Sequence, residues 1–199
     1  MAETRHSRLR HHFPSVTFVA ALLAIIVIGV IAFVWFGIYN IAADAPHTRP
    51  VYAMIESLRD RSIAVHARGI TVPADLQSAQ RVSAGAGLYD EMCTGCHLGP
   101  GIEPSEMSQG LYPQAPDLAK HHDLTPAQQF WIIKHGIKLT AMPAWGKTHP
   151  DPLIWDMVAF VRNLPGMSAE QYKAIVASAP ADHDEMMKDM PMEQGHSGH

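Results

Sequence analysis

Two cysteines and a histidine at a fixed spacing place the strongest constraint on this chain. Cys93 and Cys96 are separated by two residues, His97 follows directly, and the 199 residues contain no further cysteine. Thiols at this spacing can form thioether bonds with the two vinyl groups of a haem, while the adjacent imidazole ligates the iron. We therefore predict one covalently attached haem c, with its iron, at Cys93, Cys96 and His97.

Two other kinds of site share this cysteine spacing. A structural zinc site would need two further ligands, which only scattered histidines could supply. A thioredoxin-like redox pair lies between a strand and a helix of a βαβ unit, and the chain shows no such alternation. The surrounding sequence therefore has to decide between haem and these alternatives.

An apolar run occupies residues 16–39 and contains no charged side chain. At about 1.5 Å per residue it would form a helix of roughly 36 Å, enough to cross a hydrocarbon layer of about 30 Å. We predict a transmembrane anchor over residues 16–40. The alternative is a cleaved signal peptide, because Ala43, Asp44 and Ala45 form a small-residue site, although the run is longer than the usual apolar region of about 7–15 residues.

Charges are distributed unevenly around this run. Arg5, Arg8 and Arg10 precede it, whereas Asp44 is the first charged residue after it. The positive-inside rule then leaves residues 1–15 in the cytoplasm and the remainder on the other side of the membrane. The net charge of −4 shows no basic excess, so we expect no nucleic-acid partner.

Residues 41–75 form the predicted stalk. Val51, Met54, Ile55 and Leu58 recur at nearly helical spacing, and Gly69 follows the pattern. This predicts a short amphipathic helix ended by Gly69. We expect it to pack on the membrane surface, the haem domain or a partner, and a mobile linker is the alternative.

Residues 76–176 contain the motif and three stretches of helical pattern. The first covers residues 76–92 and leads into the motif. The second has Thr125 as its N-cap, Gln128 at the capping-box position and Gly136 at its end. These helical stretches predict an all-α domain of about a hundred residues.

The third stretch has an N-terminal signal of its own. Asp151 can cap it, Pro152 suits its first turn, and apolar residues recur at helical spacing as far as Leu164. Three helices around one porphyrin would complete the domain, so haem would supply much of its core.

Positions around the motif resemble class I cytochromes c. Gly85 lies eight residues before Cys93, and Tyr89 lies four before it. In that family a glycine and an aromatic residue at these offsets pack the first helix crosswise against the last. The resemblance implies Phe160 as their partner, and it implies a small all-α monohaem domain.

The same resemblance supplies a candidate for the second iron ligand. Residues 136–146 include Met-Pro-Ala-Trp and are similar to the methionine-ligand loop of bacterial class I cytochromes c, with Met142 as the ligand. Pro143 stiffens this loop. Met107 is a rival, and bis-histidine ligation could use a histidine from the set His121, His122, His135 and His149, which we expect to face solvent.

The resemblance also implies residues around the haem. A ligating imidazole normally donates its other N–H to a fixed acceptor, which in this family is a proline carbonyl after the motif. Pro116 matches that position best, and Pro113 is second. Trp145 is a candidate partner of a haem propionate or a wall of the pocket.

Residues 177–199 lose the apolar period and become rich in methionine and histidine. Such polarity predicts a disordered tail. Thioethers suit Cu(I) and imidazoles suit Cu(II), so weak copper binding at this tail is a further hypothesis.

Histidine and methionine ligation leaves no open position on iron, which favours electron transfer over catalysis. In the resembled proteins haem attachment is completed outside the bacterial inner membrane, which agrees with the predicted orientation. We therefore expect a single-pass, periplasmic cytochrome c that is not itself an enzyme. It would carry electrons between respiratory-chain partners such as an oxidase, a dehydrogenase or a quinol-oxidising complex, either alone or as a subunit of such a complex. The alternatives are a peroxidase-like haem enzyme with a displaceable methionine and a copper-handling haem protein.

Overall fold

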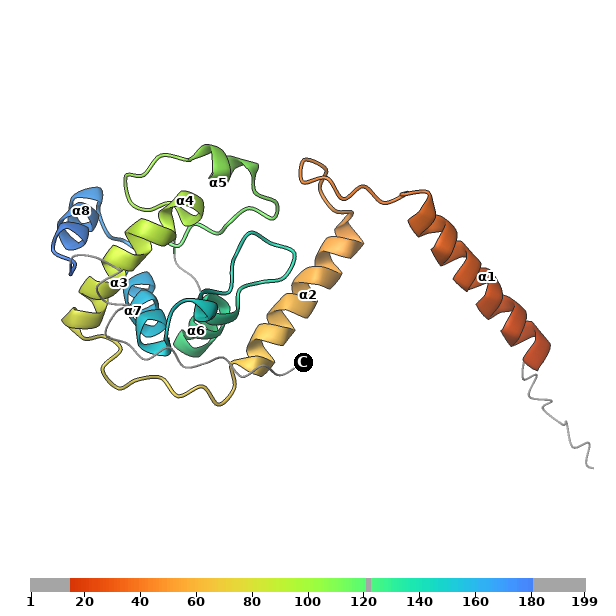
Figure 1. Cartoon of the computed structure of the whole chain (residues 1–199), viewed down its shortest axis with the longest axis horizontal. Helices are drawn as coiled ribbons and strands as arrows, with labels where there is room; N and C mark the ends of the chain where they lie inside the picture. Colours follow the sequence, from red (N-terminus) through yellow and green to blue (C-terminus); the bar gives the residue numbers. More distant parts are fainter. Residues whose placement is uncertain (1–14, 121–122, 181–199) are drawn as a thin grey trace, which may run out of the picture. The chain divides into compact units, whose positions relative to one another are not determined.

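The computed structural model describes residues 15–120 and 123–180 (Figure 1). Within these ranges all regular secondary structure is helical, which confirms the predicted all-α class. The N-terminal arginines, His121, His122 and the methionine- and histidine-rich tail from residue 181 lie outside the described residues. The chain divides into two compact units, residues 1–45 and 46–199.

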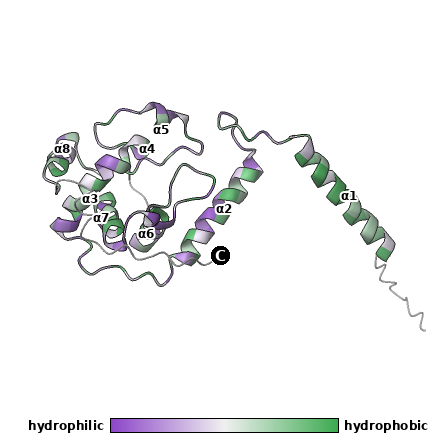
Figure 2. Ribbon diagram, viewed as in Figure 1, coloured by the Kyte–Doolittle hydropathy of each residue, from purple (hydrophilic) through white to green (hydrophobic). Residues whose placement is uncertain are grey.

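The first unit contains α1, which spans Val16–Trp35. The Ser15 hydroxyl accepts from the Phe18 amide and caps the helix, and Gly37 follows its end with a φ of +57°. Figure 2 shows apolar residues along its whole length. Among the described residues, α1 alone is long and apolar enough to cross a bilayer.

The stalk helix α2 spans Arg49–His66 and belongs to the second unit. It ends before Gly69, whose φ is +84°. Its C-terminal part buries Ile63, and the His66 ring lies 5.6 Å from the ring of Trp131 on α6. The helix was expected to pack on the membrane surface, the haem domain or a partner. The structure shows that it packs against the domain that carries the motif.

Helices α3 (Ala79–Met92) and α7 (Asp151–Asn163) form the centre of the second unit. A Cβ atom on Gly85 would overlap the Asp156 carbonyl oxygen and lie 2.8 Å from the Phe160 Cβ. The ring of Tyr89, one turn after Gly85, lies 5.3 Å from the Phe160 ring. The structure thus shows the close helix contact through Gly85 that the resemblance implied.

A charged cluster joins the same two helices at their edge. The Arg81 guanidinium on α3 bonds the Asp156 carboxylate on α7 at 2.6 Å and the Asp75 carboxylate at 3.0 Å. Asp156 lies within the run of buried residues on α7, from Leu153 to Val161. The ion pair therefore compensates a carboxylate inside an otherwise apolar interface.

Helix α6 (Pro126–His135) has the ends that its sequence predicted. Thr125 and Gln128 form a reciprocal capping box, and Gly136 ends the helix with a φ of +65°. The start of α7 differs from the prediction, because Pro150 is the N-cap and Asp151 is the first helical residue. The Asp151 carboxylate instead pairs with the Lys134 ammonium at 2.6 Å.

The expectation of three helices was too low. Helix α8 (Ala169–Ala177) packs on α3, and α4 (Thr94–His97), α5 (Glu106–Gly110) and the 3-10 turn η1 (Trp145–Lys147) are short. Ser168 and Gln171 form a second capping box at the start of α8. The serine and glutamine at this spacing are a local signal that could have predicted the helix.

Candidate functional site

The cysteines and the histidine of the motif lie on one helical turn. Cys93 is the C-cap of α3 and the N-cap of α4, and its carbonyl accepts from the amides of Cys96 at 3.2 Å and His97 at 2.8 Å. Both thiols are free rather than joined in a disulfide. Burial, with a smaller contribution from Cys96, raises the pKa of the Cys93 thiol to about 12.

A single hydrogen bond fixes the ring of His97. Its Nδ1 lies 2.8 Å from the carbonyl oxygen of Pro116. Because a carbonyl can only accept, Nδ1 carries the proton and Nε2 keeps its lone pair. Burial lowers the pKa of His97, against a raising effect of the bond to Pro116, and this favours the neutral imidazole that a metal requires.

Met142 lies on the loop between α6 and η1. Its carbonyl accepts from the Ile137 amide at 3.2 Å, and its own amide donates to the Thr140 hydroxyl at 3.1 Å. A Cβ atom on Gly136 would lie 2.6 Å from the Met142 carbonyl oxygen, so glycine is needed where the loop closes on itself. These contacts hold the backbone of Met142 in place, and its ligation of iron stays a proposal.

The other candidates occupy different positions. Met107 on α5 is exposed, and its sulfur lies 3.5 Å from the Cys96 sulfur. Trp145 packs against the apolar core, and its ring meets the His149 ring edge-on at 5.4 Å. His149 is only 4% exposed, so the expectation that it faces solvent was wrong. His135 is exposed, as expected.

The region that contains the motif and the Met142 loop matches a known protein family. Residues 80–161 match the family model of cytochrome c oxidase, cbb3-type, subunit III. Residues 80–161 form a c-type cytochrome domain. Searches of curated proteins and of solved structures found no match. The cytochrome domain includes the motif, Pro116, Met142 and Trp145, whereas α1, α2 and α8 lie outside the matched range.

The cytochrome domain carries haem c with its iron, and the structure supplies suitable residues for that group. Cys93 and Cys96 are free thiols on one turn, and His97 presents an unprotonated Nε2. Partly buried apolar side chains next to the core can wall a porphyrin, among them Met92, Ile133 and Trp145. Bound haem supplies a one-electron redox couple at its iron.

Two tyrosines support the backbone that follows His97. The Tyr89 hydroxyl donates to the Leu98 carbonyl at 2.8 Å, and the Tyr172 hydroxyl on α8 donates to the Asp90 carboxylate at 2.8 Å. A Cβ atom on Gly99 would lie 3.4 Å from the Tyr172 ring. Sequence reasoning missed Tyr172 because it missed α8.

Replacing Tyr172 with phenylalanine should lower the free energy of unfolding by about 1 kcal/mol, because the Asp90 carboxylate loses a hydrogen bond that is partly shielded from water. Chemical denaturation of the holoprotein measures this change. Lys173→Ala, at an exposed position of the same helix, is the matched control and should change the free energy by less than about 0.5 kcal/mol. Equal stability of both variants would show that the bond contributes nothing.

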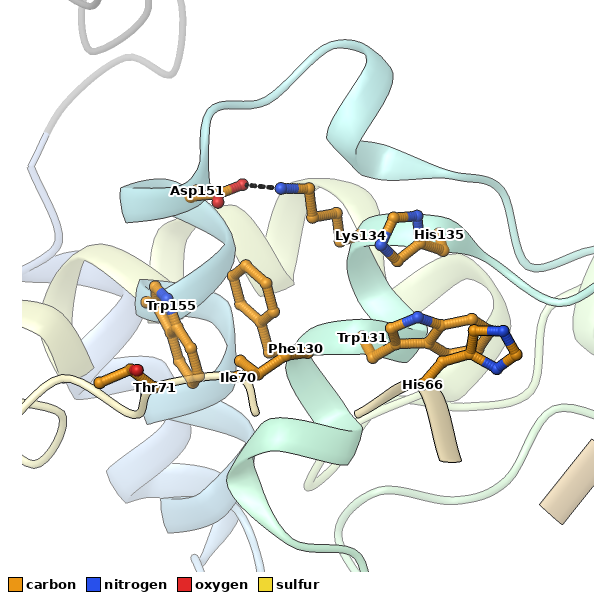
Figure 3. A pocket seen from close by; sticks show the side chains of 9 residues that line it. All are labelled: His66, Ile70, Thr71, Phe130, Trp131, Lys134, His135, Asp151 and Trp155. Atoms are coloured by element: carbon orange, nitrogen blue, oxygen red, sulfur yellow. Dashed lines mark ion pairs between the residues drawn. The ribbon is translucent and has the colours of Figure 1, made fainter. Parts of the chain in front are cut away.

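A surface cavity of about 540 Å³ lies where the end of α2 meets α6 and α7 (Figure 3). Phe130 and Trp155 stack in its wall with ring centroids 4.2 Å apart. Lys134, paired with Asp151, borders the cavity with His66, Trp131 and His135. At this cavity His66, the last residue of α2, contacts Trp131 of α6.

Proposed function

We propose that the chain is a membrane-anchored cytochrome c that carries single electrons between respiratory-chain partners. The observation that carries this proposal is the bond from His97 Nδ1 to the Pro116 carbonyl, which leaves Nε2 for iron beside two free thiols. The match to an oxidase subunit family supports a respiratory oxidase complex as the partner.

We propose His97 and Met142 as the two axial ligands. The Met142 loop is closed by its own hydrogen bonds and by the tight turn at Gly136, which supports a sulfur held at a constant position. Two protein ligands leave no open coordination position, so outer-sphere electron transfer is favoured over catalysis. Trp145 and Pro116 then serve the haem site as a wall and as the acceptor for His97.

The first unit supports a proposed location. Helix α1 has the length and apolar character of a membrane span, and Arg5, Arg8 and Arg10 precede it. This supports a single-pass anchor over residues 16–40, with residues 1–15 in the cytoplasm and the cytochrome domain in the periplasm. Residues 41–75 would then join the anchor to the haem domain over 76–176.

Met142→Ala tests the ligand assignment. The variant should lose the sulfur-to-iron charge-transfer absorption of the oxidised protein, because no thioether would remain on the iron. The reduced variant should also bind carbon monoxide, which the reduced wild type should not bind readily. Met107→Ala is the control, since its sulfur lies near Cys96 but on α5 rather than on the Met142 loop, and it should keep the absorption. An unchanged band in Met142→Ala would refute the assignment.

A further inference from the structure

The stalk helix α2 carries apolar side chains on the face that points away from the cytochrome domain. Met54, Leu58 and Val65 are 65%, 70% and 40% exposed. Positions four and seven residues apart share one face of a helix, so these three side chains form a single outward stripe. We call Met54, Leu58, Arg61 and Val65 the outer stripe of α2.

The opposite face of α2 is turned toward the domain. Ile63 is buried there, and His66 packs against Trp131 on α6. Glu56 and Arg59 also lie on this side, partly buried, and they pair at 3.5 Å. The inner face thus includes an ion pair beside the buried Ile63, and the outer stripe exposes three large apolar side chains beside Arg61. An ordinary surface helix instead exposes a polar face.

One positive charge lies within the outer stripe. Arg61 is exposed and makes no ion pair with another described residue, whereas Arg59, on the opposite face, is neutralised by Glu56 and Asp60. Arginine can extend its guanidinium to anionic headgroups while its methylene groups stay in an apolar layer. An apolar stripe that includes a basic residue is a feature of helices that lie in a membrane interface.

The connection to α1 keeps α2 close to the end of the proposed anchor. Only residues 36–48 separate α1 from α2. Fully extended, this link reaches at most about 45 Å. A helix tethered at this distance meets a lipid surface at high effective concentration.

We propose that the outer stripe of α2 lies in the headgroup region of the bilayer and binds anionic lipid. This inference rests on the proposed anchoring by α1. With its inner face on α6 and its outer stripe in the lipid, α2 would hold the cytochrome domain against the membrane surface and restrict the partners it can reach to those beside it in the same membrane.

Spin labels on the full-length holoprotein in nanodiscs test the proposal. Cysteines introduced by Ile28→Cys, Leu58→Cys or Lys173→Cys can be labelled selectively, because Cys93 and Cys96 are held in thioethers to haem. Collision with oxygen reports contact with lipid, and collision with a nickel chelate reports contact with water. In discs containing phosphatidylglycerol, the label at position 58 should be at least about threefold less accessible to nickel than that at position 173. Its accessibility to oxygen should lie between the values at positions 173 and 28, as expected for a site near the headgroups.

The charge contribution is tested by the lipid composition. The label at position 58 should become more accessible to nickel in discs of phosphatidylcholine alone. Adding Arg61→Gln should have the same effect in the anionic discs. A label at 58 as accessible to nickel as that at 173 would overturn the proposal while leaving the anchor intact if the label at 28 stays in lipid. Water contact at position 28 would overturn the anchor and this proposal together. Shielding of position 58 from both reagents would also overturn it, in favour of a protein or a second copy on this face.

Discussion

Replacing Gly85 with alanine is expected to lower the free energy of unfolding of the holoprotein by about 3 kcal/mol or more and to reduce its yield strongly. The new Cβ would overlap the backbone of Asp156 and lie 2.8 Å from the Phe160 Cβ. Backbone atoms of a buried helix cannot rotate away, so α3 and α7 would have to separate. Separation would also disturb the Tyr89–Phe160 contact and the Arg81–Asp156 ion pair.

Chemical denaturation and covalent haem staining of purified protein measure this effect. Gly87→Ala in the same helix is the matched control, because its new Cβ would approach only the Ala179 Cβ, at 3.1 Å, beyond the end of α8. The gain in helix propensity, about 1 kcal/mol, should offset that contact. Comparable stability of Gly85→Ala and Gly87→Ala would contradict the close packing of α3 on α7.

The double variant Cys93→Ala, Cys96→Ala is expected to retain no haem after denaturation. The chain has no other thiol, so neither vinyl group could form a thioether. Haem staining of a denaturing gel, with the protein amount checked by antibody, measures the loss. Each single variant should keep one thioether and hence a reduced signal.

Met107→Ala is the control for this experiment as well. The substitution removes a sulfur that lies 3.5 Å from Cys96 but changes no residue of the motif, so the variant should retain full staining. Full staining of the double variant would mean that haem is attached elsewhere, and the assignment of Cys93 and Cys96 would then be wrong.

Local signals in the sequence predicted the ends of a helix correctly where its caps depend only on neighbouring residues. The capping box of Thr125 and Gln128 and the glycine end at Gly136 are present as expected. The equivalent signal at Ser168 and Gln171 was passed over, and α8 was missed with it. Asp151 had the right residue type for a cap, but it pairs instead with Lys134 from another helix. Pairing across helices depends on the fold and cannot be read from neighbouring residues.

The sequence by itself determined the motif at Cys93, Cys96 and His97, the all-α class and the apolar helix α1, because spacing and apolar period act within a few residues. The tertiary structure showed that Pro116, which the resemblance ranked above Pro113, is the proline that bonds His97, since only folding brings a carbonyl onto the imidazole. It also decided that Tyr172 reaches Asp90, and that α2 buries Ile63 against the domain and leaves Met54, Leu58 and Val65 exposed. Amphipathic spacing shows that a helix has two faces, and only packing shows which of them the protein itself covers.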